Sequence, residues 1–280
     1  MDGAAAVPAL RRAVLDWYGA VARDLPWRRT TDPYAILVSE VMLQQTQVAR
    51  VVERYERWLE RWPDVHALAG ARTADVLAEW VGLGYNSRAL RLQRAAQAVA
   101  RDGWPADAAG LRALPGIGPY TAAAVASFAF GEVVAAVDVN TARVAARLGL
   151  GDPRVLLPEA SGPAATWNQA MMELGATVCG ARAAACDRCP AADWCSSRGA
   201  VDVPARRGRG RGRDGGPAAV RFEDTNRWVR GRIVAGLAAG TGVPEDIPAA
   251  RLDPALAGLA RDGLIERHDG AWRLPGDVLH

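Results

Sequence analysis

The sequence predicts an all-α protein with a small additional domain at its C-terminal end. Three features of the 280-residue chain support this: apolar residues recur at helical spacing through residues 7–198, strand patterns are rare there, and a glycine-rich stretch follows. Apolar side chains three and four positions apart share one face of a helix. We expect helices at residues 8–23, 34–48, 51–61, 74–81, 88–101, 119–130, 141–149 and 164–177.

The helix expected at residues 34–48 carries an acid among apolar residues. Glu40 shares its face with Ile36 and Leu43, at offsets of four and three. Burial raises the pKa of a carboxyl, so such a group can hold a proton near neutral pH and act as a general acid. The alternative is a partly buried glutamate paired with an arginine such as Arg28 or Arg29.

The sequence LPGIGPYT at residues 114–121 predicts a helix-hairpin-helix element. Gly116 and Gly118 allow a partner to approach the backbone closely, and the helix that includes Thr121 directs its free amides there. An isolated G-x-G would indicate an ordinary turn. With Leu-Pro before it and Thr after it, the pattern is typical of a hairpin that holds one DNA strand through its phosphates.

Asp138 follows the apolar run at residues 133–137 and precedes the next expected helix. Either Asp138 or Asn140 is the N-cap of that helix. Alternatively, Asp138 faces bound DNA as an ionised carboxylate. A protonated and an ionised carboxyl together can cleave a glycosidic bond through a cationic sugar.

All four cysteines form one C-x6-C-x2-C-x5-C segment, Cys179, Cys186, Cys189 and Cys195. A disulfide framework would spread its cysteines along the chain, whereas four thiolates in one loop suit a soft metal centre. Zinc and a [4Fe-4S] cluster both take four thiolates. Only one pair has the short zinc-knuckle spacing, which favours iron and sulfur and leaves zinc open.

The C-terminal end contains a linker and a small domain. Arginines alternate with glycines within residues 199–220, which predicts a flexible basic linker, either a solvated tether or a phosphate-contacting arm. Residues 221–280 are typical of a small winged helix, with helices at 226–237 and 253–261 and a hairpin at 264–274 that turns at Asp269-Gly270. This domain either binds DNA or packs on its neighbour, the domain of residues 1–198.

Composition narrows the chemistry. The chain has no lysine, so all 34 basic side chains are arginine, and a mechanism that needs a lysine nucleophile is excluded. No apolar run approaches the roughly 20 residues of a membrane span, and the first ten residues lack the pattern of a secretion signal. We expect a cytoplasmic protein without membrane contact.

Several ordered motifs resemble the MutY family of adenine DNA glycosylases, within the endonuclease III superfamily. They are LPWR at residues 25–28, SEVMLQQTQV at 39–48, GLGY at 82–85, LPGIG at 114–118, VDVN at 137–140, NQAMMELG at 168–175 and the four cysteines. The resemblance covers about residues 10–198. Its hairpin, aspartate and cysteines are shared across the superfamily, whereas the run around Glu40 is far more specific.

The resemblance implies a two-lobed fold with an active-site cleft and a role for each matched residue. The cysteines would hold a [4Fe-4S] cluster. Glu40 would protonate the departing adenine, and Asp138, supported by Tyr120 and Asn140, would stabilise the sugar cation. Trp27, Arg28, Leu43 and Glu173 would line the pocket for the flipped base. Gln45 and Tyr85 would wedge into the DNA stack.

The implied function is a monomeric base-excision repair enzyme that hydrolyses the N-glycosidic bond of adenine mispaired with 8-oxoguanine or guanine in double-stranded DNA, at the nucleoid. A lysine stands at the position of Tyr120 in the lyase branch of the superfamily, so we expect a monofunctional glycosylase. Two departures concern lesion choice: the tail is too short and too helical for the Nudix-like domain common in the family, and Asn86 follows Tyr85 where a second aromatic is frequent.

Two other functions remain open. One is a related glycosylase for thymine or uracil opposite guanine, or for a deaminated purine. The other is a non-catalytic iron-sulfur protein that binds DNA.

Overall fold

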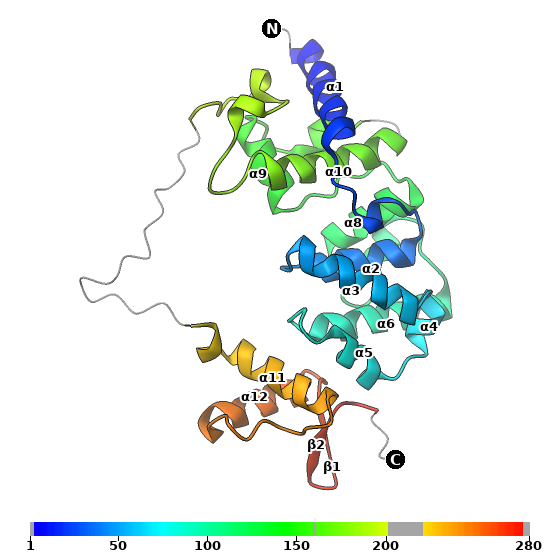
Figure 1. Cartoon of the computed structure of the whole chain (residues 1–280). Coiled ribbons are helices and arrows are strands. Elements are labelled where there is room, and N and C mark those ends of the chain that lie inside the picture. The colour runs from blue at the N-terminus through cyan, green and yellow to red at the C-terminus, as the bar shows by residue number, and fades with distance from the viewer. Residues whose placement is uncertain (1–2, 159–160, 201–220, 277–280) are drawn as a thin grey trace, which may run out of the picture. The chain divides into compact units, whose positions relative to one another are not determined.

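The computed structural model describes residues 3–158, 161–200 and 221–276, which fall into two compact units (Figure 1). Unit 1 comprises residues 1–36, 106–112 and 118–216, and unit 2 comprises residues 37–105, 113–117 and 217–280. The expected linker lies outside the described residues from residue 201 onward. The expected domain limits at residues 198 and 221 stay a prediction.

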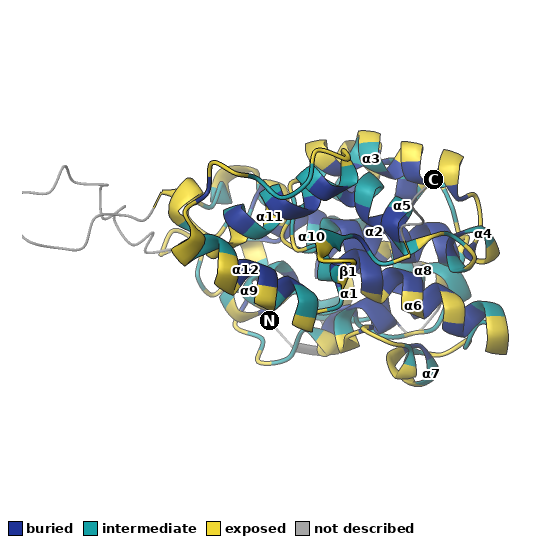
Figure 2. Ribbon diagram, turned by 90° about the horizontal axis from the view of Figure 1, so that it is seen from below, coloured by how far each residue is buried: buried dark blue, intermediate teal, exposed yellow. Residues whose placement is uncertain are grey.

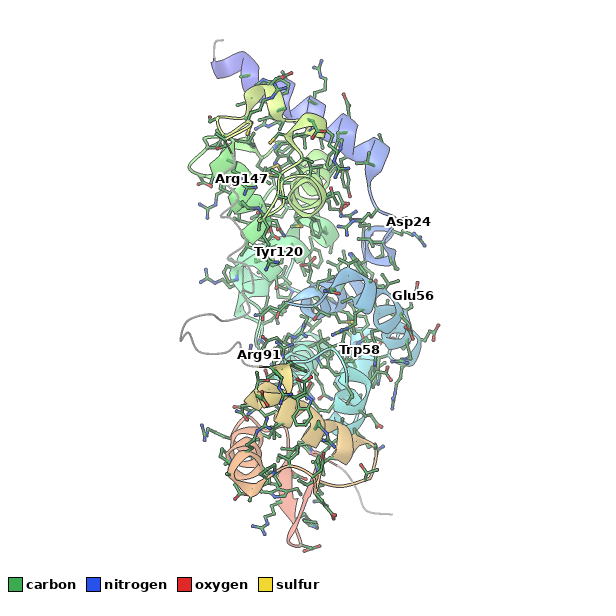
Figure 3. The ribbon with its side chains drawn as sticks, turned by 60° about the vertical axis from the view of Figure 1, so that its left-hand side comes forward. Asp24, Glu56, Trp58, Arg91, Tyr120 and Arg147 are labelled. Carbon is green, nitrogen blue, oxygen red and sulfur yellow. The ribbon has the colours of Figure 1, made fainter. Side chains whose placement is uncertain are left out.

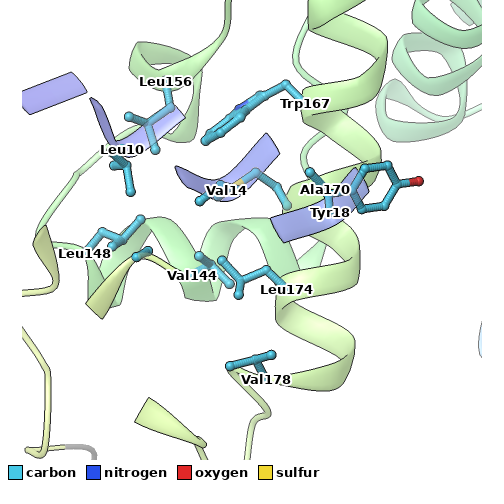
Figure 4. Packing of buried hydrophobic residues seen from close by; sticks show 12 residues of the cluster. Leu10, Val14, Tyr18, Val144, Leu148, Leu156, Trp167, Ala170, Leu174 and Val178 are labelled. Atoms are coloured by element: carbon cyan, nitrogen blue, oxygen red, sulfur yellow. The ribbon is translucent and has the colours of Figure 1, made fainter. Parts of the chain in front are cut away.

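Unit 1 has its core between three helices. α10 (Ser161–Thr177) packs on α1 (Gly3–Val21) and on α9 (Val139–Arg147). The buried side chains that meet there include Val14, Val144 and Leu174 (Figure 4). Each aliphatic side chain buried to this degree contributes about 1.5–3 kcal/mol relative to exposure. Cys179, Cys189 and Cys195 pack against the same core, so the cysteine segment is part of this unit's structure.

The remaining elements of unit 1 are shorter or lie beside the hairpin. They are η1 (Pro26–Arg28), α7 (Ala108–Ala113), α8 (Pro119–Phe130), η2 (Pro153–Leu156), η3 (Cys186–Arg188) and η4 (Ala192–Trp194), where η denotes a 3₁₀ helix. Only the last residue of α7 is assigned to unit 2. α2 (Pro33–Leu43) begins in unit 1 and continues into unit 2.

Unit 2 has a tryptophan-rich core. Trp58 on α3 (Val48–Arg61) lies edge-on to Trp80 on α5 (Thr73–Trp80), with ring centroids 5.5 Å apart. α6 (Ser87–Asp102) packs against α5 and against α4 (Val65–Ala69). Both tryptophans are fully buried. Aromatic pairs in this geometry add about 0.5–1.5 kcal/mol to the contribution of their buried area.

The C-terminal residues of unit 2 form two helices and a hairpin. α11 (Asn226–Ala238), preceded by η5 (Phe222–Asp224), packs against α12 (Ala249–Arg261) and against α5. β1 (Glu266–His268) pairs with β2 (Ala271–Arg273) in antiparallel register. The turn has φ of 49° at Asp269 and 83° at Gly270, as a two-residue hairpin requires. These elements agree with the helices and hairpin expected from the sequence, and the classification as a winged helix stays a prediction.

The mostly helical architecture expected from the apolar periodicity is confirmed, with two kinds of difference. The short helices α4 and α7 were not expected, because one turn of helix shows too little periodicity. The helix expected at 34–48 is wrong at its end: α2 stops at Leu43, and Gln45 has φ of 55°, so the backbone turns before α3 begins. None of the described helices is both long and apolar enough to cross a membrane.

Candidate active site

Glu40 lies on a buried stretch of unit 2. It is 7% exposed, and all of residues 34–42 on α2 are buried (Figure 2). The two arginines considered as its partners form ion pairs in unit 1: Arg28 with Glu173 and Arg29 with Asp24. The expected burial of Glu40 among apolar residues of α2 is present. Its role as a general acid stays a prediction.

The two residues expected to wedge into DNA share a rare backbone conformation. Gln45 and Tyr85 have φ of 55° and 49°, and Asp269 is the one other non-glycine residue with positive φ in the described chain. Both are exposed, Tyr85 by 40%. A residue other than glycine adopts this backbone conformation at a cost of about 1–3 kcal/mol. Contacts with the surrounding residues must offset this cost.

Arg88 provides those surroundings. It is 5% exposed at the start of α6, and the four N–H groups of its two terminal nitrogens are shared among six acceptors in the two turns that hold Gln45 and Tyr85. The acceptors are the carbonyl oxygens of Val41, Met42, Gln44, Leu83 and Gly84 and the hydroxyl of Thr46, at 2.7–3.2 Å. One buried side chain thus ties the end of α2 to the loop before α6.

The charge of Arg88 is maintained despite its burial. Burial lowers the pKa of Arg88 to about 10, with a further lowering from the nearby Arg227 and an opposing effect of Tyr85. The guanidinium therefore stays positive at neutral pH. It faces carbonyls of the last turn of α2, where the helix dipole favours a cation. Sequence reasoning missed this residue, because a lone arginine on a helix gives no local signal.

Asp138 is the N-cap of α9 in unit 1. Its Oδ1 accepts hydrogen bonds from the backbone N–H groups of Asn140 and Thr141, at 2.9 and 2.7 Å. Its Oδ2 accepts one from Asn140 Nδ2 at 2.8 Å, and Thr141 completes a capping box. The structural explanation for Asp138 is therefore confirmed. It is compatible with a chemical role, because these donors stabilise a negative charge and fix its position.

A chain of hydrogen bonds links Asp138 to the cysteine segment. Arg143 donates to Asn140 Oδ1 at 2.9 Å and to the carbonyl oxygen of Cys179 at 3.0 Å. It also donates to the carbonyl oxygen of Gly175 at 2.8 Å. A Cβ at Gly175 would lie 2.7 Å from Asn140 Cβ, so α10 can approach α9 here only with glycine. Neither Arg143 nor Gly175 was expected as a supporting residue.

Tyr120, on α8, is half-buried, and its hydroxyl lies 3.7 Å from the sulfur of Met172 (Figure 3). Its expected support of Asp138 stays a prediction. Thr121 is 3% exposed, and its contact with a DNA phosphate stays a prediction. Gly116 has φ of 77°, and a Cβ there would lie 2.6 Å from Arg91 Cβ. The glycine is therefore needed both for its conformation and for space.

Three of the four residues expected to line the base pocket belong to unit 1. Trp27 is 8% exposed, and Arg28 beside it donates to Glu173 Oε2 at 2.7 Å. Arg23 makes two hydrogen bonds to Glu173, at 2.6 and 2.9 Å. Burial pushes the pKa of Glu173 up, but these arginines outweigh it and hold the pKa below its usual value. Leu43, the fourth residue, belongs to unit 2 at the end of α2.

The four cysteines are free thiols, and each is half-buried. Burial raises the pKa of the Cys189 thiol, a hydrogen bond with the backbone of Ala191 opposes this, and the other three cysteines raise the pKa further. Arg147 donates to Cys179 Sγ at 3.2 Å and to the carbonyl oxygen of Gly180 at 2.8 Å (Figure 3). Within the described residues, no three His, Cys, Asp or Glu side chains form a group that could hold a metal ion.

Comparison with known proteins defines the class. Residues 38–159 match the HhH-GPD superfamily of base excision DNA repair proteins. A solved thermostable thymine-DNA glycosylase is 26% identical, with a TM-score of 0.66 over 71% of this chain and 100% of that one. A trapped endonuclease III–DNA intermediate is 22% identical, with a TM-score of 0.61 over 71% of this chain and 99% of the other, and shows the shared fold.

The family follows from a curated relative. The adenine DNA glycosylase of Mycobacterium tuberculosis is 42% identical over 295 aligned positions, which cover 94% of this chain and 93% of that protein. This chain therefore belongs to the adenine DNA glycosylase family, the MutY type of the helix-hairpin-helix superfamily.

Replacement of Arg88 by alanine should destabilise the protein by about 2–4 kcal/mol, because it leaves buried carbonyl oxygens without donors. Chemical denaturation measures this change. The control is Arg101→Ala, which removes an exposed arginine from the same helix and should change stability by about 0.5 kcal/mol or less. Equal losses in the two variants would contradict the role given to Arg88.

Replacement of Glu173 by glutamine should make the free energy of unfolding change less with pH in the acid range. The folded pKa lies below the ordinary value of about 4.3, so Glu173 stabilises the fold above that pH and loses this effect as the pH falls through the folded pKa. The variant should be less stable at pH 7 by about 1.5–3 kcal/mol, and the gap should narrow below about pH 4. Unfolding curves across pH test this, with exposed Glu56→Gln as the control (Figure 3). A gap that stays constant with pH would refute it.

Proposed function

We propose that this protein removes adenine mispaired with 8-oxoguanine or guanine from double-stranded DNA, by hydrolysis of the N-glycosidic bond. The observation that carries the proposal is Glu40, a buried carboxyl inside the run at residues 39–48 by which the sequence resembles the MutY family. The M. tuberculosis relative, named an adenine DNA glycosylase, supports the choice of base. We also propose that the protein acts as a monomer in the cytoplasm, at the nucleoid.

Each acid is assigned one task by its surroundings. Glu40, held away from water, donates a proton to the departing adenine, because a neutral base leaves more easily than an anion. Asp138, fixed by three N–H donors, faces the sugar and stabilises the positive charge that develops as the bond breaks. Water then completes the hydrolysis.

Adenine must leave the base stack before either acid can act on it. Unstacking costs a few kcal/mol, which contacts in the pocket and in the emptied stack must recover. Gln45 and Tyr85 suit the second task, because both are exposed and both turns are tied down by Arg88. Side chains already in place lose less freedom on binding. We assign the flipped base to Trp27, Arg28, Leu43 and Glu173.

The product is an abasic site in an unbroken strand. Strand cleavage by the lyase branch of the superfamily uses a lysine amine, and this chain has none. The residue at that hairpin position is Tyr120.

We also propose that Cys179, Cys186, Cys189 and Cys195 hold a [4Fe-4S] cluster. The support is a set of four free, half-buried thiols within seventeen residues. Only Cys186 and Cys189 have the short spacing of a zinc knuckle, which favours the cluster over zinc. When bound, the cluster would brace the loop that Arg143 and Arg147 contact.

A second function has one specific observation in its favour. The thermostable thymine-DNA glycosylase is aligned over its whole length and is 26% identical. Thymine opposite guanine is therefore the alternative substrate to include in any test.

The test is a panel of duplexes with adenine, thymine, uracil or hypoxanthine opposite guanine or 8-oxoguanine, cleaved with alkali after incubation. We expect breaks at adenine in both purine pairs, and none before alkali. Glu40→Gln should slow release by about 100-fold or more, because it removes the proton with little change in shape, while Glu56→Gln should behave like the wild type. Release of thymine alone, or cleavage without alkali, would refute the proposal.

The cluster is tested on purified protein. We expect a yellow-brown solution with about four irons per chain, and loss of colour and iron when Cys186 is replaced by serine. The control is Ser196→Ala in the same segment, which should keep both. A colourless preparation that contains only zinc would show that the cluster assignment is wrong.

A further inference from the structure

Tyr85, the proposed wedge, contacts the C-terminal part of unit 2. Arg227 at the start of α11 donates from Nη1 to Tyr85 Oη at 2.9 Å, across 142 residues of sequence. The same guanidinium lies over the Tyr85 ring, with its central carbon 4.4 Å from the centroid. One arginine therefore holds both the ring face and the hydroxyl of the wedge.

The contact is part of a larger stack. Arg227 also lies over the ring of Phe222, 5.3 Å from its centroid, and Phe222 is 52% exposed. Two exposed aromatic rings from distant segments thus share one planar cation. These three side chains line a pocket of about 610 Å³ together with the loop at residues 81–87. Arginine suits such a site because its guanidinium is planar and can stack and donate at once.

The position of Arg227 is built into the fold. Thr225 caps α11 by accepting a hydrogen bond from Trp228 N–H at 3.3 Å, and α11 packs against α5, which leads into the Tyr85 loop. A Cβ at Gly84 would lie 3.9 Å from Arg227 Nη2, so the loop backbone is close as well.

We infer that Arg227 is a positioning residue for Tyr85, and that the C-terminal segment of this chain thereby orders the proposed wedge before DNA binds. This rests on the proposed function of Tyr85 as the wedge. An exposed tyrosine on a left-handed turn would otherwise sample several rotamers and would have to be ordered when DNA binds. With Arg227 stacked on it, the ring is ordered before DNA arrives. The segment at residues 221–276 would then assist the opening of the base stack by ordering one side chain of the loop at residues 81–87.

The inference is tested by a double-mutant cycle between Arg227 and Tyr85 in the full chain. Two quantities are measured: the single-turnover rate of adenine release opposite 8-oxoguanine, and the affinity for that duplex relative to one with only paired bases. Arg227→Ala should reduce both by about 5- to 20-fold. Arg227→Lys should recover little, since it keeps the charge without the planar stack. In a Tyr85→Ala background, Arg227→Ala should have almost no further effect.

Arg232→Ala is the matched control. Arg232 lies on the same helix, over Trp228 and paired with Asp246, so the variant loses the same charge without a contact to Tyr85 among those the structure describes. It should behave like the wild type in both measurements.

Two results would overturn the inference. One is wild-type behaviour of Arg227→Ala, and the other is an equal loss with and without Tyr85, which would mean that Arg227 contacts DNA by itself. If the wild type releases no adenine but Arg227 and Tyr85 remain coupled in affinity for the mispaired duplex, the proposed function fails and the positioning role stands.

Discussion

The arrangement of unit 2 depends on the buried guanidinium of Arg88. Its hydrogen bonds close the end of α2 and the loop before α6 at the same time, so the position of Glu40 along α2 and the conformations of Gln45 and Tyr85 have one common support. A buried cation is favourable only when its donors are nearly all satisfied. Among the described residues, the Nε of Arg88 is the one buried side-chain nitrogen or oxygen atom without a hydrogen-bond partner. The strain of two left-handed residues is thus offset by one dense group of hydrogen bonds.

In unit 1, a series of hydrogen bonds connects Asp138 to the cysteine segment. Asp138 is held by Asn140, Asn140 by Arg143, and Arg143 reaches the carbonyl oxygen of Cys179. The cysteine segment is the last member of this series of hydrogen bonds, and it packs on the core of α1, α9 and α10. The backbone of this segment thus supports Asp138 indirectly, because the carbonyl oxygen of Cys179 accepts a hydrogen bond from Arg143, which also donates to Asn140.

The absence of lysine has a structural counterpart as well as a chemical one. Arg88, Arg143, Arg147 and Arg227 each contact two or more groups in different directions, which a planar guanidinium with five N–H donors can do. An ammonium group is a compact point charge and could not bridge two turns in this way. Arginine, the basic side chain used throughout this chain, therefore also joins separate segments of the fold through hydrogen bonds.

The sequence by itself determined the features that depend on short spacing. Helical periodicity located the longer helices, Asp138 and Asn140 before the next expected helix predicted a cap, and Asp269-Gly270 predicted the hairpin turn. The apolar neighbours of Glu40 predicted its burial. Each of these depends on residues within about four positions of one another, where backbone geometry alone decides which side chains meet.

Tertiary structure decided the rest. Glu173 is paired with arginines 145 and 150 residues away, Tyr85 with one 142 residues away, and Arg88 with the end of a helix more than 40 residues before it. Tertiary structure also decides that α2 ends at Leu43, because carbonyl oxygens at this end of the helix accept hydrogen bonds from Arg88 on α6. No local pattern encodes such pairs, since they exist only after the apolar cores have brought the segments together.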